Sequence, residues 1–177
     1  MKALIIEDEK FVREYLTSLL RNEFDFDEIV QAVDGEVGWQ LFEQQSFQFI
    51  ILDLLLPKLD GIQLAKRILK RGRGHRILAI SSECDDFTVR EVSRSGILGF
   101  VSKKDMSHDI MNEALGEIFD GHVYYSASVL QVLERVRNDP DAYFKVLSKR
   151  ELQVLRYIAQ RRSHDEIAKE LGLSDFT

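Results

Sequence analysis

Cysteine is almost missing from this 177-residue chain, which has Cys84 alone. A single thiol excludes an internal disulfide framework and any zinc cluster built from several cysteines. No apolar run is long enough to cross a bilayer, and Glu7 and Asp8 interrupt the N-terminal segment before a signal-peptide core could form. The histidines show no spacing typical of metal ligands: His75, His108, His122 and His164. We therefore expect a cytoplasmic protein with no association with the membrane.

The chain also lacks the excess of positive charge that is typical of a protein that binds nucleic acid over its whole surface. Its net charge is -6, but the charges are unevenly spread. From Leu147 onward there are six lysines and arginines and five acidic residues, so the acidity belongs to the part before it. We therefore expect any contact with DNA to come from the C-terminal region.

Five short, nearly continuous apolar runs predict parallel strands covered by helices on both faces. They are Lys2–Ile6, Glu28–Val33, Gln48–Leu52, Arg76–Ile80 and Gly99–Ser102. Segments with helical periodicity lie between and after them: Phe11–Phe24, Glu36–Gln44, Ile62–Arg71, Phe87–Arg94 and Ser107–Phe119. The pattern predicts an α/β fold, a (βα)5 doubly wound parallel sheet whose working site lies at the carboxyl ends of the strands.

Near Gly121 the alternation stops, and the rest of the chain has the pattern of helices. A helix is predicted over Ser126–Asn138, before Asp139-Pro140-Asp141 breaks the pattern. We expect a domain over residues 1–121, a helical linker over 122–146 and part of an all-α domain over 147–177.

Three carboxylates are predicted to meet at one edge of the sheet. Glu7 and Asp8 end the first strand and Asp53 ends the third. Two carboxylates about 4 Å apart repel each other by roughly 4 kcal/mol at an effective dielectric constant near 20, so such a cluster needs a cation. Mg2+ suits carboxylate oxygens and keeps positions open for a phosphoryl group. Lys103, just past the fifth strand, adds a positive charge at the same edge.

These residues resemble the receiver family of two-component response regulators over residues 1 to about 120. The segment Asp53-Leu-Leu-Leu-Pro57-Lys-Leu-Asp60-Gly61 is similar to the family's D-x-x-M-P-x-x-D-G, with Leu56 in place of methionine. Lys104 is a departure, because many members have proline or aspartate there. Further family positions are matched in order: an acidic pair at Glu7 and Asp8, the phosphoacceptor at Asp53, a hydroxyl residue at Ser81, a switch aromatic at Phe100 and a lysine at Lys103.

The resemblance implies a flavodoxin-like receiver with strand order 2-1-3-4-5 and a function in a phosphorelay. Asp53 would accept a phosphoryl group from a phosphohistidine of a sensor histidine kinase. Mg2+ would be held by Asp8, Asp53 and the backbone carbonyl of Leu55, with Glu7 contacting it through water. Lys103 and Ser81 would then hold the phosphoryl oxygens, and Phe100 would rotate toward the space that Ser81 leaves. Dimerisation on activation would follow.

The same residues admit other interpretations. Glu7 and Asp8 alone would suit a solvated loop. An aspartate-nucleophile phosphatase of the haloacid dehalogenase type needs a second aspartate two positions after the first, and Leu55 stands there. A receiver that acts only as an interaction module, without phosphorylation, would be marked by a missing site residue, and none is missing.

The C-terminal region is similar to the NarL/FixJ, or LuxR-type, helix-turn-helix domain. The resemblance is carried by Leu147-Ser-Lys-Arg-Glu151 and by Glu166-Ile-Ala-x-x-Leu171-Gly-Leu-Ser174, with capping boxes at the start of both helices. An unrelated helical hairpin is the alternative.

Ser174 is placed as the cap of the helix that reads DNA, and the chain ends within that helix's first turn. The resemblance therefore implies that the intact protein binds DNA, whereas we expect little or no specific binding by this chain. We also expect Ile158, Ile167 and Leu171 to form an exposed apolar patch.

Overall fold

The structure, a computed structural model, describes residues 1–72 and 74–138 without a gap, followed by single positions further along. These positions are Glu151, Val154, Tyr157, Glu166, Ile167, Glu170 and Leu171. The chain divides into two compact units, Met1–Glu134 and Arg135–Thr177. The predicted boundaries at residues 121 and 146 stay predictions.

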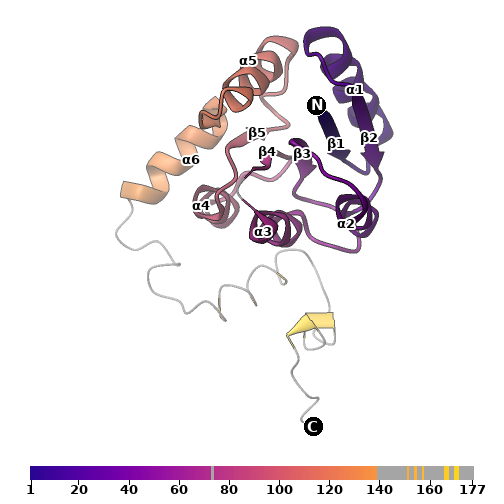
Figure 1. The fold of residues 1–177 in the computed structure, drawn as a ribbon. Helices are drawn as coiled ribbons and strands as arrows, with labels where there is room; N and C mark the ends of the chain where they lie inside the picture. The colour runs from indigo at the N-terminus through magenta and orange to yellow at the C-terminus, as the bar shows by residue number, and fades with distance from the viewer. Residues whose placement is uncertain are drawn as a thin grey trace. The chain divides into compact units, whose positions relative to one another are not determined.

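A parallel sheet forms the centre of the first unit (Figure 1). Its strands are β1 (Lys2–Ile6), β2 (Glu28–Ala32), β3 (Phe49–Asp53), β4 (Arg76–Ser81), β5 (Gly99–Ser102) and β6 (Tyr124–Tyr125). The order across the sheet is β2-β1-β3-β4-β5-β6. The five predicted strands and the order 2-1-3-4-5 are confirmed.

Helices cover both faces of the sheet, as the continuous apolar strands predict. They are α1 (Lys10–Glu23), α2 (Gly35–Gln44), α3 (Gly61–Arg71), α4 (Asp86–Ser95), α5 (His108–Phe119) and α6 (Ala127–Asn138). In Figure 1, α1 and α5 lie on one side of the sheet and α2, α3 and α4 on the other. Four of the helices begin with an N-cap residue whose side chain accepts a hydrogen bond from a backbone N–H of the first turn. These residues are Asp34, Asp60, Asp85 and Ser107.

Two hydrophobic clusters fill the space between the sheet and these helix layers. Alternate residues of β3 divide between them: Phe49 and Ile51 pack on the side of α1 and α5, whereas Ile50 and Leu52 pack on the side of α3 and α4. All five residues of β3 are buried. The central strand therefore fixes Asp53, at its end, in a well-packed frame.

One prediction about the end of the first unit is wrong. The sequence predicts only helices after Gly121, but Tyr124 and Tyr125 pair with Gly99 and Phe100 as a sixth parallel strand. A two-residue strand carries no periodicity from which it could be predicted. Its backbone covers the side of β5 that would otherwise be the sheet edge.

The second unit is described at few positions. Glu151, Val154 and Tyr157 are helical, as are Glu166, Ile167 and Glu170, which is consistent with the two predicted helices. The expectation that Ile167 and Leu171 are exposed is wrong, because both are buried in a cluster with Tyr157. Ile158, Ser174 and the predicted caps at Ser148 and Ser163 lie outside the described residues.

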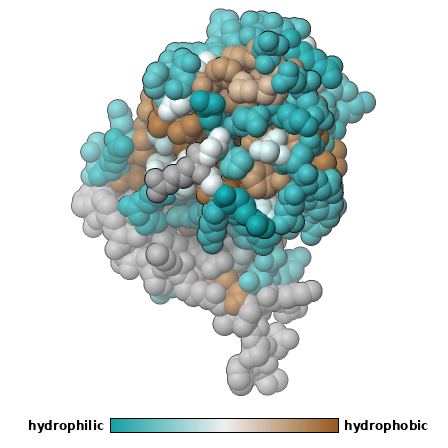
Figure 2. Space-filling model, in the orientation of Figure 1, coloured by the Kyte–Doolittle hydropathy of each residue, from teal (hydrophilic) through white to brown (hydrophobic). Residues whose placement is uncertain are grey.

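Hydrophilic residues cover most of the face of the first unit shown in Figure 2, with hydrophobic residues visible between them. The large hydrophobic side chains that the described residues expose are Phe11, Val33, Val123 and Leu130. None of the helices in the described part of the chain has the length and hydrophobicity needed to cross a membrane.

Candidate functional site

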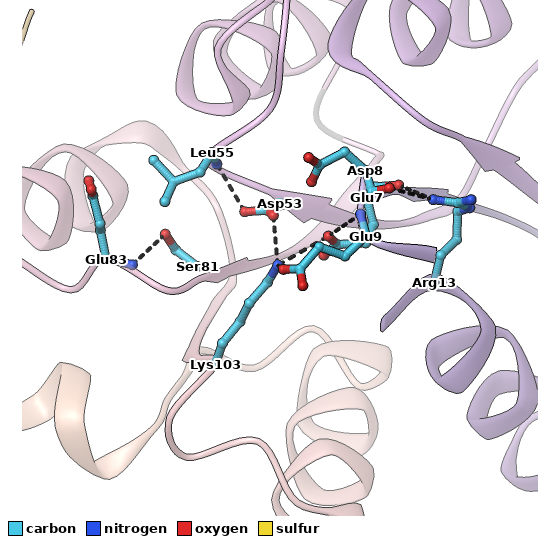
Figure 3. Close-up of polar contacts among 9 residues, drawn as sticks. All are labelled: Glu7, Asp8, Glu9, Arg13, Asp53, Leu55, Ser81, Glu83 and Lys103. Atoms are coloured by element: carbon cyan, nitrogen blue, oxygen red, sulfur yellow. Dashed lines mark hydrogen bonds and ion pairs between the residues drawn. The ribbon is translucent and has the colours of Figure 1, made fainter. Parts of the chain in front are cut away.

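The carboxyl ends of four strands bring the predicted site residues together (Figure 3). Glu7 directly follows β1, Asp53 ends β3, Ser81 ends β4 and Lys103 directly follows β5. In the figure, Glu7, Asp8 and Glu9 lie on one side of Asp53, whereas Leu55, Ser81 and Glu83 lie on the other. Parallel strands end at the same edge of a sheet, so residues far apart in the sequence meet there.

Lys103 is the positive centre of the site. Its Nζ donates hydrogen bonds to Asp53 Oδ2 at 2.9 Å, Glu7 Oε1 at 3.1 Å and Glu9 Oε1 at 2.8 Å. Burial by itself would lower the pKa of the Lys103 ammonium, but these hydrogen bonds and the charge of Asp53 raise it above its usual value. Lys103 is therefore held in its charged form between the carboxylates.

Glu7 is fully buried, which is unusual for a carboxylate. Its Oε1 also accepts a hydrogen bond from the Glu9 backbone N–H at 3.1 Å, but its Oε2 is buried without a hydrogen-bond partner among the described residues. Burial, and next the charge of Asp53, raise the pKa of Glu7 from 4.5 to about 7. The single positive charge of Lys103 thus does not neutralise the cluster.

The acidic cluster has the composition and spacing of a site for a divalent cation. One ligand oxygen each from Glu7, Asp8 and Asp53 lie within 4.8 Å of one another. Asp8 is exposed to solvent, whereas Glu7 and Asp53 are buried. A hard cation that prefers oxygen ligands would reach these three carboxylates. It would compensate the negative charge that Lys103 does not neutralise.

Two residues of the site were not predicted from the sequence. Glu9 contacts Lys103 from the start of α1, and Arg13 lies one turn later. Arg13 Nη1 donates to the backbone carbonyl oxygens of Glu7 at 2.7 Å and Asp8 at 3.1 Å, which fixes the loop that carries the acids. The run of three acidic residues was a visible signal for Glu9, whereas nothing in the sequence indicated the backbone contacts of Arg13.

Backbone contacts fix the opposite side of Asp53. The Leu55 N–H donates to Asp53 Oδ1 at 2.9 Å, and the Glu83 N–H donates to Ser81 Oγ at 3.1 Å. Gly61 leaves the chain room to pass, because a Cβ at this position would overlap the Asp53 carbonyl oxygen. The turn from Ser81 to Glu83, rather than bulk solvent, therefore orients the Ser81 hydroxyl.

Phe100 does not line the acidic site. It lies in β5, is fully buried and belongs to the hydrophobic cluster on the side of α3 and α4. The predicted site residues are therefore placed in two groups. The acids, Lys103, Ser81 and Leu55 surround the end of β3. The Phe100 ring instead belongs to β5, the strand that leads to Lys103, and is buried in the core.

Comparison with known proteins gives the same picture for both parts of the chain. Residues 3–115 match the model of the response regulator receiver domain, and residues 145–177 match the model of the bacterial regulatory proteins of the luxR family. The chain is 31% identical over 175 residues to the fimbriae Z protein of Salmonella typhimurium, and the alignment covers 98% of this chain and 83% of that protein. It is 30% identical over 177 residues to the transcriptional regulatory protein LiaR of Bacillus subtilis, with 98% and 83% covered.

A solved structure of RcsB from Salmonella enterica serovar Typhimurium is similar over 98% of this chain and 84% of that one, with 25% identity and a TM-score of 0.74. RcsB was solved bound to the promoter rprA in the presence of the phosphomimetic BeF3-. The matched families are regulators and not catalytic enzymes. With its acidic receiver pocket of Glu7, Asp8 and Asp53 and its LuxR-type DNA-binding output, the chain belongs to the two-component response regulators.

Proposed function

We propose that Asp53 is the phosphoacceptor of this response regulator and that a sensor histidine kinase supplies the phosphoryl group. The observation that carries the proposal is the position of Asp53, whose Oδ2 contacts Lys103 while its ligand oxygen lies within 4.8 Å of those of Glu7 and Asp8. The carboxylate attacks phosphorus, the bond to the kinase histidine breaks, and the nitrogen leaves with its electron pair.

Lys103 and Ser81 are the residues that hold the transferred group in this proposal. The Lys103 ammonium already contacts Asp53 and is 14% exposed, so a shift within the site would bring it to the phosphoryl oxygens. The Ser81 hydroxyl ends the neighbouring strand, β4. Its movement toward the phosphoryl group would open space for Phe100, which is the predicted switch.

The cation in this proposal is Mg2+, held by Asp8, Asp53 and the Leu55 carbonyl, with Glu7 in contact through water. The buried Glu7 Oε2 that lacks a partner among the described residues supports a cation at this place. When bound, Mg2+ would offset the repulsion between the Asp53 carboxylate and the incoming phosphoryl group.

The output half of the proposal follows from the luxR-family match of residues 145–177. We expect phosphorylation to favour a homodimer and to control the binding of promoter DNA, as the promoter complex of RcsB illustrates for a relative. The domain boundaries at 1–121, 122–146 and 147–177 belong to this proposal. Because its partners are a kinase and DNA, we place the protein in the cytoplasm.

Intact-mass measurement after incubation with acetyl phosphate and Mg2+ tests the proposal. The wild type should gain one phosphoryl group, and Asp53→Asn should gain none. Asp109→Asn is the matched control, because Asp109 is a fully exposed aspartate at the start of α5, and this variant should gain the group as the wild type does. A phosphoryl group on Asp53→Asn, or none on the wild type, would show that Asp53 is not the acceptor.

A further inference from the structure

The helix that leaves the receiver, α6, is capped by a residue of the loop that carries Lys103. Asp105 accepts hydrogen bonds from the Ser128 backbone N–H at 2.9 Å and from the Ser128 hydroxyl at 2.6 Å. Ser128 lies in the first turn of α6, where backbone N–H groups have no partner within the helix. A carboxylate from another segment therefore takes the place of the usual local cap.

Ser126, the residue in the usual capping position, is bonded both to β5 and to Asp105. The carbonyl of Ser126 accepts the first helical hydrogen bond, from the Leu130 N–H at 2.9 Å. Its hydroxyl, however, accepts a buried hydrogen bond at 3.1 Å from the N–H of Ser102, the last residue of β5. The Ser126 N–H donates to the Phe100 carbonyl at 3.0 Å. Two residues of β5, Phe100 and Ser102, are thus bonded to Ser126, which directly precedes α6.

Hydrogen bonds hold the Asp105 carboxylate in this position. Burial raises the pKa of its carboxyl, but hydrogen bonds from Ser126 and Ser128 outweigh this effect and hold the pKa below its usual value. Only Lys104 separates it from Lys103, and the Asp105 N–H donates to the Ser102 carbonyl at 2.9 Å, which makes the connection a tight turn. A displacement of the Lys103 backbone would therefore reach Asp105 through a single intervening residue.

Packing links the same elements a second time. Val129 and Leu133 of α6 are buried in the hydrophobic cluster that also contains Phe100. Tyr125, which precedes α6 in β6, pairs with Phe100 in the sheet. A reorientation of the Phe100 ring therefore changes the packing of the cluster to which the first half of α6 contributes.

We propose that Asp105 is a positioning residue that couples the phosphorylation site to α6: when Lys103 moves to hold the phosphoryl group, Asp105 is drawn away from Ser128 and the first turn of α6 loosens. The inference rests on the proposed phosphorylation of Asp53. Because coupling between two sites is reciprocal, removing the Asp105 contact should also favour the arrangement of Lys103 that binds the phosphoryl group.

Hydrogen exchange on the full chain tests the coupling, with intact mass recorded on the same samples to follow phosphorylation separately. In the wild type, acetyl phosphate and Mg2+ should make the amides at the start of α6 exchange about tenfold faster, the size expected for the loss of one charge-assisted hydrogen bond. In Asp105→Ala these amides should exchange fast from the outset and should not respond to phosphorylation. The variant should also gain the phosphoryl group faster than the wild type.

Asp109→Ala is the matched control and should behave as the wild type, because Asp109 lies near the same loop but is fully exposed. Ser128→Ala keeps the backbone N–H and should show a smaller effect than Asp105→Ala; it serves as the second variant if Asp105→Ala does not fold. The coupling alone is overturned if the wild type is phosphorylated but its amides in α6 exchange at an unchanged rate. It is also overturned if phosphorylation speeds this exchange in Asp105→Ala and Ser128→Ala as much as in the wild type. A chain that gains no phosphoryl mass overturns the proposed function, and the coupling falls with it.

Discussion

Replacing Glu7 by glutamine removes a negative charge that is buried beside Asp53. Burial and the charge of Asp53 raise the pKa of Glu7 from 4.5 to about 7, so the folded, metal-free protein binds this proton more tightly than the unfolded chain does. Stability from this proton is fully present below pH 4.5 and is lost as the pH rises toward 7. One pKa unit corresponds to about 1.4 kcal/mol, so the whole loss is about 3 kcal/mol.

Glutamine keeps the shape of the side chain and cannot ionise, so Glu7→Gln should not show this loss. Its amide oxygen can still accept from Lys103 and from the Glu9 N–H, the two donors that contact Oε1 in the wild type. We expect the free energy of unfolding of the wild type to fall relative to that of Glu7→Gln by about 2 kcal/mol between about pH 5 and pH 8 in EDTA. Histidines titrate in both proteins and cancel in the difference.

Urea unfolding followed by the fluorescence of Trp39, the only tryptophan of the chain, measures this difference within the first unit. Glu9→Gln is the control: hydrogen bonding to Lys103 lowers the pKa of the exposed Glu9, so its titration lies below this pH range. With Mg2+ the wild type should lose most of its pH dependence, because the cation favours the charged carboxylate. Parallel stability curves for wild type and Glu7→Gln in EDTA would refute the reasoning.

Further predictions concern the residues around Asp53. Leu55→Asn should speed loss of the phosphoryl group several-fold if the apolar side chain slows the approach of water, and phosphoprotein decay followed by mass would show no change if it does not. Lys103→Met should lower the free energy of unfolding in EDTA at neutral pH by about 3 kcal/mol or more, because it leaves Glu7 and Asp53 without their cation; urea unfolding equal to that of the wild type would contradict this. Gly61→Ala should destabilise the protein by about 2 kcal/mol or more, because the added Cβ meets the Asp53 carbonyl, and an unchanged melting curve would show that the loop has room.

The sequence predicted most of the sheet because its strands are long enough and apolar enough to carry a pattern. Four of the five predicted strands begin at the expected residue. The exception is β3, which begins at Phe49, one residue after the predicted start. The convergence of Glu7, Asp8, Asp53 and Lys103 was predictable for a topological reason, since parallel strands end at one edge. Such inferences need only the order of the elements.

Contacts made by turns could not be predicted in this way. Glu9, Arg13 and Asp105 act through backbone groups or through residues that are distant in sequence, and no periodicity indicates which atoms they reach. The cap that Asp105 gives to Ser128 joins residues 23 positions apart. The buried state of Ile167 and Leu171 was missed for a similar reason, because Tyr157 was not counted among the residues of their cluster.

The sixth strand has a consequence for how receivers and outputs are exchanged between proteins. Because β6 pairs with β5, a fragment cut after residue 121 would present the backbone of β5 as an open edge, to which another chain can add. Because side chains alternate along a strand, deleting one residue between α5 and β6 would turn each tyrosine toward the opposite face. Chimaeric regulators built on this receiver should therefore be joined beyond Glu134, with the spacing before Tyr124 left intact.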